Sequence, residues 1–455
     1  MTRTLALCAT LFGLGAVVGY LLARPAVGPL TGAGAEVKLV PPAIAAVEGP
    51  ARASEQPRPL APPPTQRTTP TTPTTLDAAL PDGATTAVVS PASRPAPAPG
   101  PIVDRRAGCP DHLFTAPGRL VAGGDPFLEQ RMQWLLEDYD VPAGAVAVVE
   151  PVSGRLLAAA GYREGVGEDR GLTLAPDHTA ASIFKIVSAI ALLESGLKID
   201  DTICYNGGKR RIHERQLEDD PGRDGRCADF TTALGRSLNI PFAKWADRRL
   251  DRGRLRGAAE RFGFRTGDDD GGACFGQILI PDDRLSFART AAGFGEVTLS
   301  AWHGALIGAL VANRGVWPSS LDGVAGRQGR LLSSALADQL ATMMVHTVDE
   351  GTARRAFRER GHFALGRINV AGKTGSLTEG EGEAWRDVTW FVGFAPVEAP
   401  TVSVAAMIVN KPAWRIRASY VGREALRTAL LRTSPYRPTQ DRIAVASVPP
   451  AGDTP

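Results

Sequence analysis

The stretch Ala181-Ser182-Ile183-Phe184-Lys185-Ile186-Val187-Ser188 places a serine and a lysine three residues apart at the start of an apolar run. The run continues to Leu193 and is followed by Gly196, a pattern typical of a buried helix with a glycine at its end. Residues three apart share a helix face, so the Ser182 hydroxyl and the Lys185 amine are expected one turn apart. A helix N-terminus also stabilises developing negative charge. The stretch therefore meets the requirements of an activated serine, although Ser-x-x-Lys alone equally fits an N-cap serine beside a solvated lysine.

Two further short motifs follow in order. Ser237-Leu238-Asn239 precedes Ile-Pro, which predicts a loop or a short turn between helices that aims a hydroxyl and an amide into a cleft. Lys373-Thr374-Gly375 follows a short apolar stretch, and the apolar runs 388–396 and 401–408 come after it, so this part predicts an antiparallel sheet. A glycine within a strand indicates close approach of another backbone. Each tripeptide alone equally fits an ordinary polar turn or a solvated edge strand.

The order Ser-x-x-Lys, Ser-x-Asn, Lys-Thr-Gly resembles that of the penicillin-recognising serine enzymes, which are the penicillin-binding proteins and the serine β-lactamases. Segments 293–300, 311–315, 350–353 and 390–396 are also similar to the transpeptidase domain of high-molecular-weight penicillin-binding proteins. The resemblance implies an α/β (α+β) fold of the β-lactamase/transpeptidase kind. In this fold, helices flank an antiparallel sheet and a second lobe is mostly helical.

The resemblance implies catalytic roles for the residues of the first two motifs. Ser182 is similar to the acylated nucleophile, and Lys185 to the base that takes its proton, which requires a lowered amine pKa. Ser237 would relay the proton to the leaving group. Asn239 would hold the substrate amide and position Lys185.

The third motif is implied to bind the substrate's carboxylate. Lys373 and Thr374, followed by Gly375 on the same strand, would hold the terminal carboxylate of a D-Ala-D-Ala stem peptide or of a penicillin. The backbone N–H groups of Ser182 and Ser376 would form the oxyanion hole. No metal or organic cofactor is implied.

The resemblance ranks the possible activities. A class A β-lactamase needs Glu-x-x-Leu-Asn after the second motif, but Glu214-Arg215-Gln216-Leu217 falls before Ser237 and Glu218 follows where Asn is required. A class D enzyme would carry an apolar residue at Asn239. A peptidoglycan D,D-transpeptidase is therefore expected first, a D,D-carboxypeptidase second and a β-lactamase-like hydrolase third. A penicillin-sensing or scaffold module of the same fold is the non-enzymatic alternative.

Composition and targeting signals indicate an exported domain on a tether. The net charge of +3, from 51 basic and 48 acidic residues, gives no reason to expect nucleic acid as a partner. Residues 1–25 contain an apolar run long enough to cross a bilayer, which favours an uncleaved anchor over a signal peptide. Residues 26–106 are rich in Pro, Ala and Thr and predict a disordered tether. Residues 107–435 are predicted to form the transpeptidase-like domain, and residues 436–455 a disordered tail.

These features predict a single-pass protein of the cell inner membrane, with its catalytic domain in the periplasm or another extracytoplasmic space. The predicted ligands are peptidoglycan stem peptides ending in D-Ala-D-Ala, and β-lactams as covalent ligands. The resemblance covers no glycosyltransferase domain, so a partner protein in cell-wall synthesis is a further expectation.

Four cysteines lie in the exported part of the chain, and they allow three disulfide pairings. Cys204 and Cys227 bracket a charged loop, which favours that pair. Cys109 and Cys274 then form the second pair. The spacing of the four suits no zinc site.

Overall fold

The computed structural model describes residues 109–110, 113, 123–208, 211–267, 274–322, 324, 327–380, 385–411 and 414–433. The predicted membrane segment (1–25), tether (26–106) and tail (436–455) lie outside these residues, so the domain boundaries remain predictions. Among the helices that are described, none has both the length and the apolar character needed to span a bilayer.

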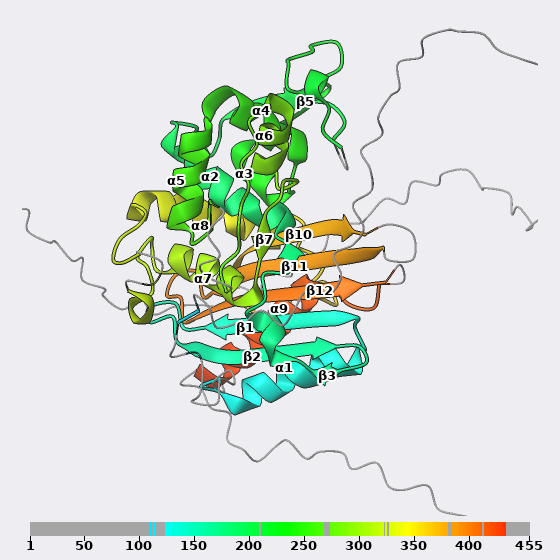
Figure 1. Cartoon of the computed structure of the whole chain (residues 1–455), viewed down its shortest axis with the longest axis vertical. Helices are drawn as coiled ribbons and strands as arrows, with labels where there is room; N and C mark the ends of the chain where they lie inside the picture. Colours follow the sequence, from blue (N-terminus) through cyan, green and yellow to red (C-terminus); the bar gives the residue numbers. More distant parts are fainter. Residues whose placement is uncertain are drawn as a thin grey trace, which may run out of the picture. The chain divides into compact units, whose positions relative to one another are not determined.

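A six-stranded antiparallel sheet is the framework of the domain (Figure 1), with the strand order β10-β11-β12-β1-β2-β3. The antiparallel pair β1 and β2 supplies its fourth and fifth strands. The fold class predicted from the sequence is confirmed. The strands are β1 (Ala143–Val149), β2 (Leu156–Arg163), β3 (Gly167–Glu168), β10 (Ala371–Glu379), β11 (Arg386–Ala395) and β12 (Val402–Asn410).

Both faces of the sheet are buried because helices cover each of them. Along β1, Ala145 and Ala147 belong to one apolar core and Val146 and Val148 to the other, as expected when side chains alternate across a strand. Helices α1 (Pro126–Asp138) and α9 (Ala418–Thr433) pack on the second of these faces. Helix α7 (Ala301–Ala312), all of whose residues are buried, packs on the first.

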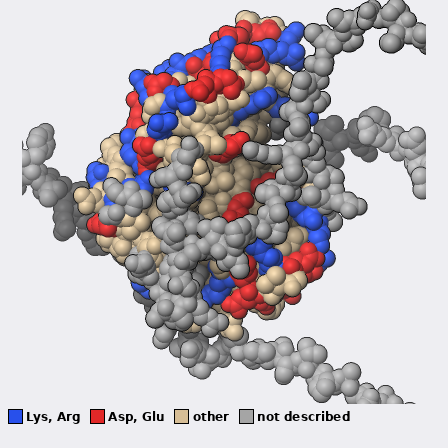
Figure 2. Space-filling model, viewed as in Figure 1, with Lys and Arg blue, Asp and Glu red and all other residues tan. Residues whose placement is uncertain are grey.

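A mostly helical lobe lies beyond the β10 edge of the sheet, where Figure 1 shows most of it in green and α8 in yellow. Helix α8 (Ser334–Asp349) and the 3₁₀ turn η3 (Ala181–Phe184) join the two parts by packing against β10. On the face shown in Figure 2, basic and acidic side chains are interspersed over this lobe, in keeping with the near-balanced charge of the chain. The helices are α2 (Lys185–Glu194), α3 (Phe230–Gly235), α4 (Asn239–Arg249), α5 (Arg252–Arg261), α6 (Arg284–Ala291) and α8 (Ser334–Asp349).

Short strand pairs and single turns complete the connections. The strand pairs are β4 (His178–Thr179) with β7 (Thr298–Leu299), β5 (Thr202–Tyr205) with β6 (Arg226–Asp229), and β8 (Arg358–Glu359) with β9 (His362–Phe363). The 3₁₀ turns are η2 (Arg170–Thr173), η3 (Ala181–Phe184), η4 (Glu214–Gln216) and η5 (Ser319–Leu321).

The structure contains both disulfides that the sequence favours. Cys204 and Cys227 are directly opposite each other on β5 and β6, where their bond closes the base of the charged loop. Cys109 bonds Cys274 across a sequence separation of 165 residues, against 23 for the other pair. Both sulfurs of the long-range bond are in buried residues.

Removing the long-range disulfide is expected to destabilise the domain more than removing the short-range one. A crosslink that closes a longer loop removes more entropy from the unfolded chain, which gives about 5 kcal/mol as an upper estimate for Cys109–Cys274 and about 3 kcal/mol for Cys204–Cys227. Denaturant unfolding of the two Cys→Ser double variants measures both losses. The opposite order of stabilities would contradict the expectation.

Candidate active site

Ser182 lies in a single 3₁₀ turn, η3, and not in the α-helix expected from the sequence. Helix α2 begins three residues later, at Lys185. The residue before the serine, Ala181, is the first residue of η3 and has a left-handed φ of +47°, a strained conformation for alanine. The spacing of three residues still places Ser182 Oγ 2.9 Å from Lys185 Nζ.

A glycine packs closely against the 3₁₀ turn that carries Ser182. Gly293 follows α6 with φ +84°, and a Cβ atom at this position would lie 2.5 Å from the carbonyl oxygen of Ala181 and 3.0 Å from the Cα of Ser182. Any other residue would collide with the backbone that carries the serine. Gly293 therefore allows the loop after α6 to approach the serine closely and to bring the carbonyl of Ala292 to the site.

The Lys185 amine is fully buried among three oxygen atoms. It lies 2.9 Å from Ser182 Oγ, 2.9 Å from Asn239 Oδ1 and 2.6 Å from the carbonyl oxygen of Ala292. Burial, and then the charge of Lys373, lowers the pKa of Lys185 well below its ordinary value of 10.5. A neutral amine has two N–H donors, which the amide oxygen and the carbonyl accept. Its lone pair then faces Ser182 and can take the hydroxyl proton.

Lys373, near the start of β10, brings a second buried amine to the same site. Its Nζ donates to Ser237 Oγ at 2.9 Å and to the carbonyl of Thr374 at 2.7 Å. Burial lowers the pKa of Lys373 from 10.5 to about 7. The group therefore changes charge near neutral pH, and a bound carboxylate would favour its charged form.

Ser237 lies between α3 and α4, as the sequence predicted, whereas Asn239 is already helical. It is the first residue of α4, and Pro241 sits in the first turn, where its missing N–H costs nothing. Ser237 has a left-handed φ of +54°, which is the second strained non-glycine residue at this site.

These side chains open onto a cavity of about 780 Å³. Its lining includes Ser182, Ser237, Asn239 and the β10 residues 374–378. Trp385 and Trp414 also line it, and the Arg417 guanidinium lies 4.4 Å from the centre of the Trp414 ring. The amines of the buried Lys185 and Lys373 contact the lining residues Ser182 and Ser237.

This arrangement agrees with the family comparison. The family described as the penicillin binding protein transpeptidase domain matches residues 144–427. The chain belongs to this family.

Known members of the family share modest sequence identity with this transpeptidase domain. The peptidoglycan D,D-transpeptidase PbpA of Mycobacterium tuberculosis is 25% identical over 314 residues, which cover 59% of this chain and 62% of the relative. The chain thus spans less than two thirds of the length of that curated relative.

Solved structures share the fold. The imipenem acyl-enzyme complex of M. tuberculosis penicillin-binding protein A has a TM-score of 0.52 at 21% identity and covers 69% of this chain and 80% of that one. The transpeptidase domain of Burkholderia pseudomallei penicillin-binding protein 3 has a TM-score of 0.54 at 19% identity, with coverage of 70% and 98%.

Several residues of this transpeptidase site were not singled out from the sequence. The carbonyl of Ala292 contacts Lys185, but a backbone acceptor leaves no sequence signal. The hydroxyl of Thr352 bonds that of Thr374, and only the resemblance of segment 350–353 pointed to it. Within the described ranges, no group of three or more His, Cys, Asp or Glu side chains is arranged to hold a metal ion.

Proposed function

We propose that this chain is a serine D,D-transpeptidase that forms an acyl-enzyme on Ser182 with peptidoglycan stem peptides ending in D-Ala-D-Ala. The observation that carries the proposal is the buried Lys185 amine, which lies 2.9 Å from Ser182 Oγ and whose pKa burial lowers well below its ordinary value. It removes the hydroxyl proton as the oxygen attacks the carbonyl between the two D-alanines. The backbone N–H groups of Ser182 and Ser376 stabilise the oxyanion that forms.

The Lys373 side of the cleft binds the substrate's carboxylate and helps the leaving group depart. Lys373 and Thr374 bind the terminal carboxylate, and Gly375 lets the substrate lie close to the strand. Ser237, which accepts a hydrogen bond from Lys373, passes a proton to the departing D-alanine. Asn239 holds the substrate amide. An amine of a second stem peptide then attacks the acyl-enzyme, and the new amide bond replaces the ester.

The position of the acidic side chain that lines the cavity supports transfer of the acyl group to an amine over rapid hydrolysis by water. Among the described residues that line it, Asp387 is the one acid, and its carboxylate accepts hydrogen bonds from Thr378 and Trp414. Asp387 pairs with Thr378, two residues along β10 from Ser376, which places it about 7 Å further along the cleft. Among the described residues that line the cavity, no carboxylate is thus placed beside Ser182 to activate water.

We also propose the location and the ligands of the protein. Residues 1–25 anchor it in the inner membrane, residues 26–106 tether it, and domain 107–435 works outside the cytoplasm. The two disulfides support an oxidising compartment. β-Lactams are covalent ligands, by analogy with the imipenem acyl-enzyme of the M. tuberculosis protein. A cell-wall synthesis protein is a further partner.

Labelling with a fluorescent penicillin tests the proposal on the purified full chain. We expect an adduct that persists for hours by intact mass and is absent from Ser182→Ala. With a D-Ala-D-Ala stem peptide and an amine acceptor, we expect a cross-linked product. An adduct lost within seconds, or release of D-alanine without cross-linking, would identify a hydrolase or a carboxypeptidase and contradict the proposal. The absence of any adduct would leave a binding or scaffold module.

A further inference from the structure

A second buried lysine, Lys244, lies outside the catalytic groups, on the same helix as Asn239. Its side chain has no exposed surface, and its Nζ donates to the Asp224 carboxylate at 2.8 Å and to the carbonyl of Cys204 at 3.0 Å. The Asp224 side chain is only 5% exposed, whereas Asp219, the other acid 2.9 Å from this amine, is 65% exposed. Lys244 and Asp224 therefore form a desolvated ion pair whose partners depend on each other.

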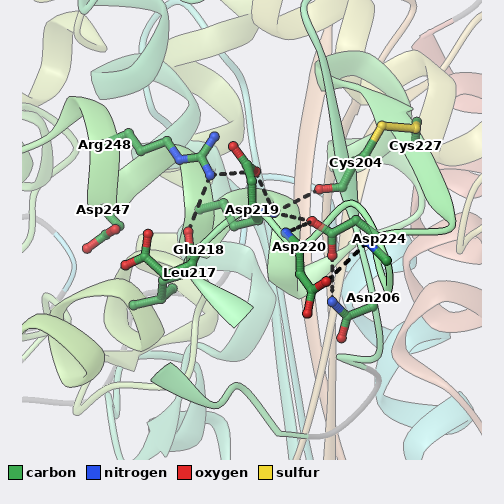
Figure 3. A network of polar contacts seen from close by, with 12 residues as sticks. Cys204, Asn206, Leu217, Glu218, Asp219, Asp220, Asp224, Cys227, Asp247 and Arg248 are labelled. Atoms are coloured by element: carbon green, nitrogen blue, oxygen red, sulfur yellow. Dashed lines mark hydrogen bonds and ion pairs between the residues drawn. A yellow bond between two sulfur atoms is a disulfide. The ribbon is translucent and has the colours of Figure 1, made fainter. Parts of the chain in front are cut away.

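Asp224 connects this ion pair to the start of the charged loop (Figure 3). Its Oδ1 accepts from the Asn206 side-chain amide at 2.5 Å, and its Oδ2 accepts from the backbone N–H of Asp220 at 3.1 Å. Burial alone would raise the pKa of Asp224, but these hydrogen bonds and that of Lys244 outweigh it and hold the pKa below its ordinary value. The carboxylate therefore stays charged and holds Asn206 in place.

The turn that begins at Asn206 packs directly on the first turn of α4. Gly208 has φ +82°, and a Cβ atom there would lie 2.1 Å from the Ile240 side chain, so only glycine fits. The backbone carbonyl of this glycine accepts a hydrogen bond from Asn239 Nδ2 at 3.2 Å.

This carbonyl determines which way the Asn239 amide points. A carbonyl can only accept, so the amide must turn its N–H₂ group to Gly208 and its oxygen to the other side. On that side, Oδ1 accepts from Lys185 Nζ at 2.9 Å. A flipped amide would face the carbonyl with its own oxygen and would offer Lys185 a donor instead of an acceptor.

We propose that Lys244 and Asp224 are positioning residues for acylation. Through Asn206 they hold the Gly208 carbonyl against Asn239, and the oriented amide in turn keeps the Lys185 amine on Ser182. The inference rests on the proposed acylation of Ser182. It gives a function to the loop between Cys204 and Cys227, which the Lys244 contact with the Cys204 carbonyl joins to α4.

The test is the acylation kinetics of Lys244→Met in the full chain, with a fluorescent penicillin. The rate constant of acylation within the bound complex and the dissociation constant of that complex are measured separately. We expect the acylation rate constant to fall about tenfold or more and the dissociation constant to stay within about twofold, because the carboxylate site on β10 is untouched. A normal acylation rate constant would overturn the inference.

A double-mutant cycle with Asn239→Ala separates positioning from a general loss of structure. If Lys244 acts through Asn239, then Lys244→Met causes no further loss in the Asn239→Ala background. Equal losses in both backgrounds would overturn the inference. Wild-type chain that takes up no label would overturn the proposed function itself, and this inference with it.

Two further variants distinguish a loss of positioning from a folding defect. Lys244→Met combined with Asp224→Leu replaces both charges with apolar groups, which avoids leaving one buried charge unpaired. If its melting temperature returns to the wild-type value while acylation stays slow, the positioning role is supported. Recovery of acylation together with stability would overturn it. Glu218→Gln removes an exposed carboxylate from the same loop, one that pairs with Arg284, and is expected to leave acylation unchanged.

Discussion

Replacing Lys185 with methionine is expected to lower the second-order rate constant of acylation by a penicillin about 10³-fold or more. Methionine has a similar length and fills the buried site, but it has no lone pair that can take the Ser182 proton. The hydroxyl then loses the amine that lies 2.9 Å from it in the wild-type protein. Stopped-flow labelling with a fluorescent penicillin measures the rate.

The control for this variant is Lys198→Met, because Lys198 is exposed shortly after the end of the same helix. It removes one lysine charge without touching the site and is expected to acylate at the wild-type rate. Thermal unfolding shows whether Lys185→Met is folded, since the variant leaves the Asn239 and Ala292 oxygens without their donor. A folded variant that reacts within about tenfold of the wild-type rate would show that another group is the base.

The affinity for a terminal carboxylate is expected to fall as the pH rises above about 7. The buried Lys373 amine has a pKa of about 7, so it is a cation below that pH and neutral above it. A carboxylate binds the cation, so each pH unit above 7 costs up to about tenfold in affinity. The measurement is the dissociation constant of a D-Ala-D-Ala peptide on Ser182→Ala between pH 6 and pH 9, where no acylation interferes.

Two comparisons isolate the contribution of Lys373. The same peptide with a C-terminal amide has no carboxylate and is expected to lose this pH dependence. Lys373→Met, added to Ser182→Ala, is expected to weaken binding at pH 6 and to flatten the dependence of affinity on pH. The difference between the pH profiles with and without this change gives the contribution of Lys373. If the affinity of Ser182→Ala for the carboxylate peptide stays constant or rises with pH, Lys373 is not the cation that binds the carboxylate.

The local patterns of the sequence predicted the elements that carry the motifs, and the structure shows why two boundaries differ. The apolar run after Lys185 forms a buried helix, but Ser182 stands before it in a 3₁₀ turn because Ala181 adopts a left-handed conformation. Asn239 was predicted in a loop and is instead the first helical residue, since Pro241 suits a first turn. Element ends depend on such capping details more than on periodicity.

The sequence by itself determined the order of the three motifs and the residue types that the chemistry needs. These are local properties, because they depend on spacing along the chain and on side-chain chemistry. Through the resemblance that they carry, they were sufficient to predict the fold class and to nominate Ser182, Lys185 and Lys373.

The tertiary structure alone decided how reactive these groups are and what holds them. The two lysine pKa values are lowered by burial, which depends on packing between the sheet and the helical lobe. The partners of Lys185 come from residues 54 and 107 positions away, and one of them is a backbone carbonyl. The Lys244–Asp224 pair and the Gly208 carbonyl are likewise joined to the site only by the fold. Such contacts leave no recognisable spacing pattern in the sequence, because they are made between segments that meet only when the chain is folded.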